Sequence, residues 1–168
     1  MSRHDGLTAI CRFFARQNEG RSEAVMTTVD PDRRPHACWM ATLVAPTFAS
    51  LLTITSPDSR KVKNVLQNPH VEWMLTGPDL SEVVYARGDM HVIHEPTPVF
   101  QYWNQLPDIS RAYFLRYQGE GMAFLLLKTA VSEYEYCVPS QNVFMTFSPA
   151  EVEQHCRDRG ASGAGGVA

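Results

Sequence analysis

Apolar and polar residues alternate over much of the middle of the chain, a pattern typical of β-strands. The longest alternation runs from Glu82 to His94, where Val84, Met90 and Val92 fall on one side. A period of two places one face of a strand on a core and the other in solvent. Other apolar or β-branched runs occupy residues 22–30, 36–44, 49–56, 70–76 and 122–138, with a short one at 142–147. About six main strands predict an antiparallel closed or split barrel.

Gly88 stands in the middle of the longest alternating run. A glycine inside a strand has no side chain to pack, and it often marks a bulge or a sharp bend. Because such a bend lets a sheet curl, Gly88 favours a barrel over a flat sheet.

Outside these runs, apolar residues recur at helical spacing. Leu7, Ile10 and Phe14 predict an amphipathic helix over residues 4–17. A second helix is predicted over residues 57–68, with an apolar face that includes Leu66. Further helical patterns cover residues 96–117, broken at Pro107, and the segment from residue 149. We therefore expect helices around the outside of the barrel.

Length and composition indicate one domain. A chain of 168 residues with 44% apolar side chains is long enough for a single core and short for two. We expect this domain to span residues 1–157. Residues 158–168 contain too little apolar surface to offset the entropy cost of ordering, so we expect a disordered C-terminal tail there.

Charge and apolar run length argue against two classes of partner. The net charge of −3 and the pI near 6.0 lack the basic excess of a nucleic-acid-binding surface. The longest apolar runs, such as residues 122–127, fall far short of the roughly 20 residues of a membrane-spanning helix. Arg12 interrupts the apolar N-terminal segment, and no cleavage site follows it. We expect a cytoplasmic protein that binds neither nucleic acid nor membrane.

The cysteine and histidine spacing does not indicate a metal site. The four cysteines lie far apart, at Cys11, Cys38, Cys137 and Cys156. Without a CxxC pair they encode neither a zinc site nor a disulfide framework, so we expect buried, reduced thiols. His91 and His94 point to opposite faces of a strand, which argues against joint metal ligation.

Residues 56–61, Ser-Pro-Asp-Ser-Arg-Lys, combine a helix start with two cations. Ser56 matches an N-cap, and Pro57 matches the first helical position. Arg60 and Lys61 then lie in the first turn, where the helix dipole already presents positive charge. A phosphate would neutralise this site, and arginine and lysine both suit a phosphomonoester. The alternative is a pair of solvated helix formers, partly offset by Asp58.

Three segments carry a resemblance to a known family. "MTTVDPDRRPHACWMATLV", "LLTITSPDSRKVKNVLQNPHVEWML" and "YARGDMHVI", in that order, resemble the FMN-binding split-barrel family of pyridoxamine 5'-phosphate oxidase, particularly its general-stress-protein branch. The resemblance covers roughly residues 20 to 137, and Asp-x-x-x-Arg-Pro-x-Ala and Ser-Arg-Lys are its most specific parts. It implies a mainly β (α+β) fold, a six-stranded antiparallel Greek-key split β-barrel with peripheral helices. It also implies a homodimer with FMN at the subunit interface.

The resemblance also implies a set of cofactor-binding residues. The Ser-Arg-Lys residues would hold the FMN phosphate, and the Thr-Ser pair upstream would lie near the phosphate and the ribityl chain. Three residues of the second predicted strand would run along the isoalloxazine ring and offer backbone hydrogen bonds. The positions are Trp39, Met40, Ala41, Thr55, Ser56, Ser59, Arg60 and Lys61.

The chain departs from the true oxidases at several positions. Cys38 stands where they carry an arginine, Leu43 where they carry a substrate-holding lysine, and Cys137 where they carry a tryptophan. The arginine-rich C-terminal segment that grips pyridoxal phosphate also has no counterpart. We therefore do not expect pyridoxamine phosphate to be the substrate.

Three functional hypotheses follow from the resemblance. The first is a dimeric FMN-dependent oxidoreductase that exchanges hydride or electrons with a small-molecule donor or acceptor, with no assigned catalytic side chain. The second is a non-catalytic flavin-binding or stress-response protein. The third is a similar barrel that holds deazaflavin or haem, which the departures at Cys38 and Cys137 leave open. Aromatic residues at 100–114 form either a wall for a flat substrate or ordinary core.

Overall fold

The computed structural model describes residues 2–18, 24–40, 43–76, 81–106, 108, 111, 112, 115, 116 and 124–163. The helices are α1 (Arg3–Asn18), α2 (Arg60–Val65), α3 (Pro96–Gln105) and α5 (Pro149–Gly163), and Pro139–Gln141 form a single 3₁₀ turn. The strands are β1 (Ala24–Val29), β2 (Pro35–Met40), β3 (Val44–Thr47), β4 (Ser50–Thr55), β5 (His70–Thr76), β6 (Val83–Ile93), β7 (Leu125–Val138) and β8 (Val143–Phe147).

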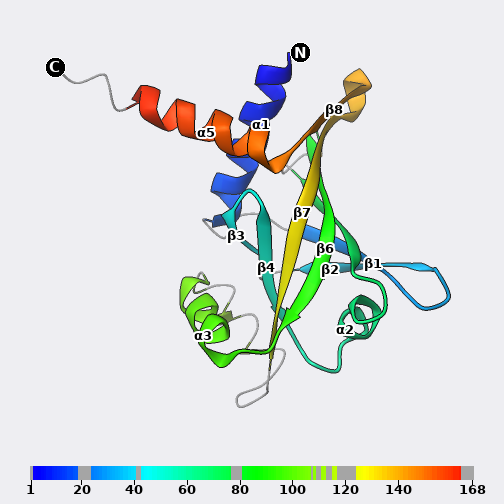
Figure 1. The fold of residues 1–168 in the computed structure, drawn as a ribbon. Helices are drawn as coiled ribbons and strands as arrows, with labels where there is room; N and C mark the ends of the chain where they lie inside the picture. Colours follow the sequence, from blue (N-terminus) through cyan, green and yellow to red (C-terminus); the bar gives the residue numbers. More distant parts are fainter. Residues whose placement is uncertain are drawn as a thin grey trace.

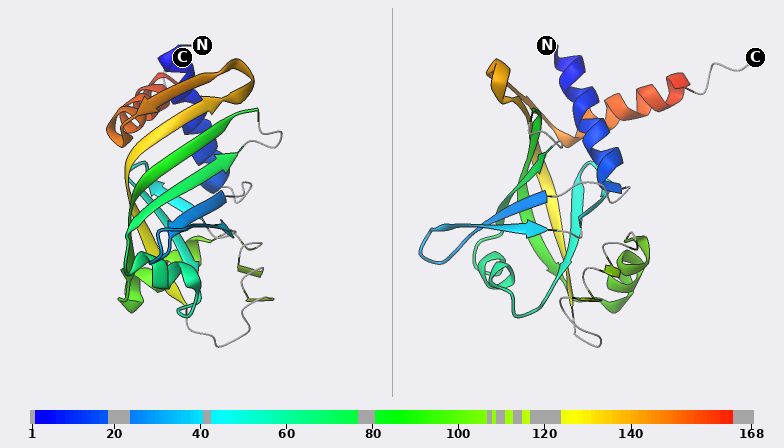
Figure 2. Two further views of the ribbon diagram at one scale, coloured as in Figure 1. Left: turned by 90° about the vertical axis from the view of Figure 1, so that its right-hand side faces the viewer. Right: turned by 180° about the vertical axis from the view of Figure 1, so that it is seen from behind.

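The strands form one antiparallel, strongly curled sheet (Figures 1 and 2). Their order is β2-β1-β5-β6-β7-β4-β3, and β8 pairs with β7. Within the described residues no strand pairing joins the edges β2 and β3, so the predicted split barrel is confirmed. The sheet has eight strands rather than six. The run predicted at residues 36–44 divides into β2 and β3, and the short run before α5 forms β8.

The helices lie around the barrel, α1 and α5 at one end and α2 and α3 near the other (Figure 2). The core combines Phe13 of α1 with Trp73 and Tyr134 of the sheet, each at most 1% exposed. The Trp73 indole N–H donates to Thr129 Oγ1 at 3.0 Å, and the Tyr134 hydroxyl donates to the Phe48 carbonyl at 2.6 Å. These bonds satisfy the buried polar atoms. The N-terminal helix therefore packs on the core, as its periodicity predicted.

The β6 strand confirms both features of its sequence pattern. Val84 and Met90 are buried, whereas Asp89 and His91 are exposed. The pairing of β6 with β7 shifts register between Arg87 and Gly88, so the predicted irregularity is present. A Cβ atom on residue 88 would lie 2.0 Å from the carbonyl oxygen of Ala130, and only glycine fits there.

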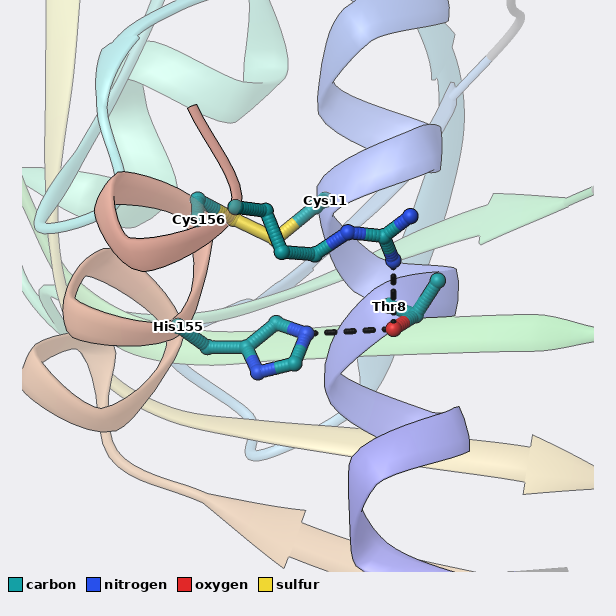
Figure 3. The surroundings of a disulfide bond; sticks show 5 residues. Thr8, Cys11, His155 and Cys156 are labelled. Atoms are coloured by element: carbon teal, nitrogen blue, oxygen red, sulfur yellow. Dashed lines mark hydrogen bonds between the residues drawn. A yellow bond between two sulfur atoms is a disulfide. The ribbon is translucent and has the colours of Figure 1, made fainter. Parts of the chain in front are cut away.

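A disulfide between Cys11 and Cys156 joins α1 to α5 (Figure 3). Our expectation of reduced thiols is wrong for this pair and consistent with Cys38 and Cys137, which are free. The two bonded cysteines are 145 residues apart in the sequence, with Cα atoms 6.1 Å apart. Sequence spacing carries no signal for a pair that only the packing of two terminal helices brings together.

The predicted helix break and tail fall at the ends of two helices. The α3 helix ends at Gln105, ahead of Pro107. The α5 helix extends to Gly163, past the start of the segment that we expect to be a tail. Disorder of that tail stays a prediction. Among the described residues no helix has the length and apolar character to cross a membrane.

Candidate functional site

The turn between β4 and α2 builds the start of the site. The backbone N–H of Ser59 donates to the Ser56 carbonyl at 3.1 Å, and the N–H of Val62 donates to the Ser59 carbonyl at 3.1 Å. Ser59, with extended dihedral angles, is therefore the N-cap, and α2 begins at Arg60. Our prediction of Ser56 as N-cap and Pro57 as first helical residue is wrong, because the chain makes a separate tight turn before the helix.

Three predicted residues form a hydrogen-bonded cluster at this turn. The Lys61 ammonium donates to Thr55 Oγ1 at 3.0 Å, and the Thr55 hydroxyl donates to Ser59 Oγ at 3.3 Å. Thr55 is buried, and Lys61 is half-buried. Ser56 joins this cluster through its carbonyl, as the partner of the Ser59 N–H. The structure thus brings four of the predicted residues together within one loop.

The positive charge of this loop has no anionic partner. Neither Arg60, which is exposed, nor Lys61 forms a salt bridge with another described residue. Asp58 is exposed and does not pair with them. Because α2 has only six residues, its dipole is weaker than that of the helix we predicted over residues 57–68. The two side-chain cations and the neighbouring hydroxyl groups therefore determine what the loop can bind.

Strand β2 approaches this loop on its inner face. Burial raises the pKa of the half-buried Cys38 thiol, and the charge of Lys61 acts in the opposite direction. The thiol donates to the Met26 carbonyl at 3.4 Å. Cys38 therefore lies within electrostatic range of the cationic loop, at the position where the resemblance places an arginine in the true oxidases.

The other predicted residues lie on β2 next to Cys38. Met40 is buried, Trp39 faces outward with 55% of its surface exposed, and Ala41 lies outside the described residues. As an edge strand, β2 pairs only with β1 among the described strands. Its free edge offers backbone donors and acceptors to a ligand, which is what the predicted ring contacts require.

A buried polar network behind α2 escaped the sequence analysis. Asn64 is 2% exposed, and its amide donates to Thr28 Oγ1 at 2.9 Å. Our expectation that Leu66 belongs to the buried face of this helix is wrong, because Leu66 is 67% exposed. A signal was available, since Asn64 follows Lys61 by three residues and so lies on the same side of the helix.

His36 supplies an orphaned atom on the same face of β2 as Cys38. Its backbone carbonyl accepts from Thr28 Oγ1 at 3.5 Å, and its Nδ1 is buried without a hydrogen-bond partner among the described residues. Buried polar atoms in native proteins normally have partners. An unpaired nitrogen near two uncompensated cations fits a bound polar anion. The residues present therefore fit a phosphate-bearing group.

Two cavities lie elsewhere on the barrel. One of about 490 Å³ surrounds Arg87 on the outer face of the sheet. Arg87 donates to Glu72 at 2.6 Å and to Glu133 at 2.7 Å, so its charge is already neutralised. The other, of about 390 Å³, lies beside α3 and is lined by Leu52, Tyr102 and Lys128, among others.

The aromatic segment is partly core. Tyr102 is 2% exposed and donates its hydroxyl to the Leu52 carbonyl at 3.0 Å. Trp103 stacks on Phe124 with ring centroids 5.3 Å apart, whereas Phe100 is 67% exposed. The aromatic residues at 113 and 114 lie outside the described residues.

A sequence profile described as pyridoxamine 5'-phosphate oxidase matches residues 16–156, most of the chain. The chain belongs to the pyridoxamine 5'-phosphate oxidase family. The match confirms the resemblance seen in the sequence, and it includes every residue of the cationic loop and of β2. Comparison with curated proteins gives no match.

Solved structures share the fold at low sequence identity. A protein related to general stress protein 26, from Clostridium acetobutylicum, has a TM-score of 0.65 and 14% identity, covering 84% of this chain and 97% of its own. A pyridoxamine 5'-phosphate oxidase-related, FMN-binding protein from Nostoc punctiforme has a TM-score of 0.58 and 19% identity, with coverages of 84% and 95%. A haem-binding protein from Mycobacterium smegmatis has a TM-score of 0.65 and 10% identity, with coverages of 84% and 59%. At these identities the likeness shows the fold alone.

Proposed function

We propose that this protein binds FMN and acts as an FMN-dependent oxidoreductase at a homodimer interface. It would exchange hydride or electrons with a small-molecule donor or acceptor. The observation that carries the proposal is the cluster of Thr55, Ser59 and Lys61, beside Arg60, with two cations that no described anion neutralises. Family membership and the FMN-binding relative from Nostoc support it.

The phosphate of FMN would occupy the cationic loop. Arg60 supplies a two-pronged donor and Lys61 a mobile one, while Ser59 and Thr55 supply hydroxyl groups. Ser56 lies at the base of the same turn. When bound, FMN supplies the hydride and electron chemistry. The protein residues hold the phosphate, position the ring and limit the access of water to it.

The flavin ring would lie along β2. Trp39, Met40 and Ala41 would offer backbone groups of the free strand edge to the polar edge of the ring. The buried Met40 and the half-buried Cys38 border the inner side of this strand and exclude water there. The low polarity of such a wall strengthens the electrostatic contacts made at the loop.

The outer face of the sheet supports the homodimer. The strand register places Trp39, Val25, Met74 and Tyr85 side by side across β2, β1, β5 and β6. This apolar row, named here the outer row, is half-buried or exposed in the single chain. Contiguous exposed apolar surface commonly marks a protein interface. A second copy seated on this row would also cover the free edge of β2, where the ring would lie.

Pyridoxamine phosphate does not suit this site. Leu43, at the position that holds substrate in the true oxidases by resemblance, is buried in the core with 6% of its surface exposed. Cys38 also replaces a phosphate-binding arginine there. The proposal is therefore a different small-molecule substrate, in the cytoplasm. Non-catalytic flavin binding and binding of haem or deazaflavin are the outcomes from which the experiments must separate it.

The first experiment identifies the cofactor. Purified protein is examined by its absorption spectrum, and mass spectrometry identifies what denaturation releases. FMN supports the proposal, whereas deazaflavin or haem overturns it. Rapid anaerobic mixing with reduced nicotinamide and a range of acceptors then tests turnover. Repeated bleaching and recovery support an enzyme, and inert oxidised flavin supports a binding protein.

The second experiment tests the cationic loop. The double variant Arg60→Ala/Lys61→Ala should lose about 3 kcal/mol of FMN binding, an affinity loss of about 100-fold or more, because two charged hydrogen-bond donors are removed. Riboflavin lacks the phosphate, so its affinity should stay unchanged. Lys63→Ala, on the exposed side of α2, is the matched control and should bind FMN normally. Equal FMN affinity in the double variant and the wild type would rule out the loop as the phosphate site.

A further inference from the structure

The disulfide between Cys11 and Cys156 ties the two ends of the described chain together. Figure 3 shows it between α1 and α5, beside Thr8 and His155. Both cysteines are half-buried, at the rim of the core rather than inside it. A small reductant can therefore approach the sulfur atoms without unfolding of the barrel.

Little else holds the C-terminal half of α5 in place. Val152, near the start of the helix, is the described α5 side chain that enters the core, with 0% exposed. Residues 157–159 are exposed. Burial of one valine contributes about 1.5–3 kcal/mol. The helix therefore has an anchored first turn and a second half with almost no apolar contact.

The polar contacts of this second half are weak. Arg159 donates to Thr8 Oγ1 at 2.7 Å, and the His155 ring bonds to the same hydroxyl at 3.1 Å. The rings of His4 and His155 meet at 4.7 Å. Contacts between exposed polar groups contribute little net stability, because water competes for the same atoms. The covalent bond is the one strong link here.

The first turn of α5 has a separate attachment. The side chain of Glu151 accepts hydrogen bonds from the backbone and hydroxyl of Ser148 at 2.8 Å each, and Arg3 donates to Glu151 at 2.9 Å. Helix α1 is held independently by Phe13 and Phe14, both buried. Breaking the disulfide would thus leave α1, the first turn of α5 and the barrel in place.

We propose that the Cys11–Cys156 disulfide is a reversible redox clasp that docks the second half of α5 on α1 when oxidised and releases it when reduced. In compartments that keep thiols reduced, disulfides are usually transient and redox-sensing. Accessible disulfides are also the labile class. The clasp lies at the opposite end of the barrel from α2, so it is separate from the proposed cofactor loop (Figure 2).

The redox step is ordinary thiol–disulfide exchange. A thiolate of a dithiol reductant attacks one of the two sulfur atoms, the S–S bond breaks, and the other protein sulfur leaves as a thiolate. The second thiol of the reductant then closes a cyclic disulfide and releases the first cysteine. The protein gains two electrons and two protons, and the dithiol loses them. A small-molecule disulfide such as oxidised glutathione reverses the step and becomes two thiols.

The test is hydrogen–deuterium exchange on the full chain, after treatment with oxidised glutathione or dithiothreitol. Mass spectrometry of the oxidised sample without reductant should show the Cys11 and Cys156 peptides linked. In the reduced sample we expect faster exchange in residues 153–163, with unchanged exchange in α1 and the sheet. The double variant Cys11→Ser/Cys156→Ser should match the reduced sample in both conditions, and Cys38→Ser should respond like the wild type.

Two results would overturn the clasp. One is the absence of the linked peptide after oxidation. The other is equal exchange in residues 153–163 in the two redox states, which would mean that noncovalent contacts dock the helix. The measurement is made on the protein with and without added FMN, so failure of the flavin proposal would leave this result intact.

Discussion

At the cationic loop, single side chains replace the helix dipole as the source of order. Thr55 joins Lys61 to Ser59, and these bonds hold the ammonium over the turn in the absence of any described anion. Asn64 then fixes the helix from behind by its bond to Thr28 of β1. The position of the loop against the barrel therefore depends on one buried amide, three residues beyond Lys61.

We predict that Asn64→Leu destabilises the protein by about 1–3 kcal/mol, because the buried Thr28 hydroxyl loses its donor. Urea unfolding followed by fluorescence measures the change. Thr28→Val in the Asn64→Leu background should recover part of the loss, since both polar groups are then gone. Lys63→Ala should have little effect. A stable Asn64→Leu variant would show that the amide does not anchor the helix.

At the level of elements, β6 and β7 show how one residue shapes a sheet. The two strands make the longest pairing in the barrel, and their register shifts at Gly88. No side chain fits there, because a Cβ atom would meet the carbonyl of Ala130 at 2.0 Å. The obstacle is backbone rather than a flexible side chain, so neighbouring residues cannot move aside easily.

We predict that Gly88→Ala lowers the free energy of unfolding by at least about 2 kcal/mol, because overpacking against a backbone forces the strands apart. Thermal and urea unfolding measure this loss, and a variant that fails to fold agrees with it. His91→Ala, at an exposed position of the same strand, is the control and should unfold like the wild type. A fully stable Gly88→Ala protein would mean that the two strands can separate at the bulge without cost.

At the level of the whole molecule, the split in the barrel and the outer row make one chain incomplete as a cofactor site. The edge of β2 is free, and Trp39 beside it is 55% exposed. A second copy would cover both. We therefore expect the dimer and the flavin to depend on each other.

We predict that Met74→Glu converts the dimer to a monomer of about 18.9 kDa and reduces FMN content, since a carboxylate in the outer row is costly to bury. Light scattering coupled to size exclusion gives the mass, and absorbance gives the flavin content. Phe144→Glu, at an exposed aromatic residue of β8, is the matched control and should stay dimeric. A monomeric wild-type protein that retains FMN would refute the interface.

Much of the fold and part of the site could be predicted from the sequence. The period of two over residues 82–94, the bend at Gly88 and the family all follow from local pattern. So does the choice of Thr55, Ser59 and Lys61, which the structure brings together, although their role stays a prediction. Local pattern suffices there because strand alternation and a loop motif depend on residues close together in the chain.

Tertiary structure alone decided the rest. Asn64 is buried and Leu66 exposed because Thr28, 36 residues earlier than Asn64, meets the helix from another strand. The helix itself, at six residues, is too short for periodicity to identify its buried face. Cys11 and Cys156 bond because two terminal helices pack together across 145 residues of sequence. In each case the partner is distant in the chain, so burial and bonding were set by packing and not by neighbours in sequence.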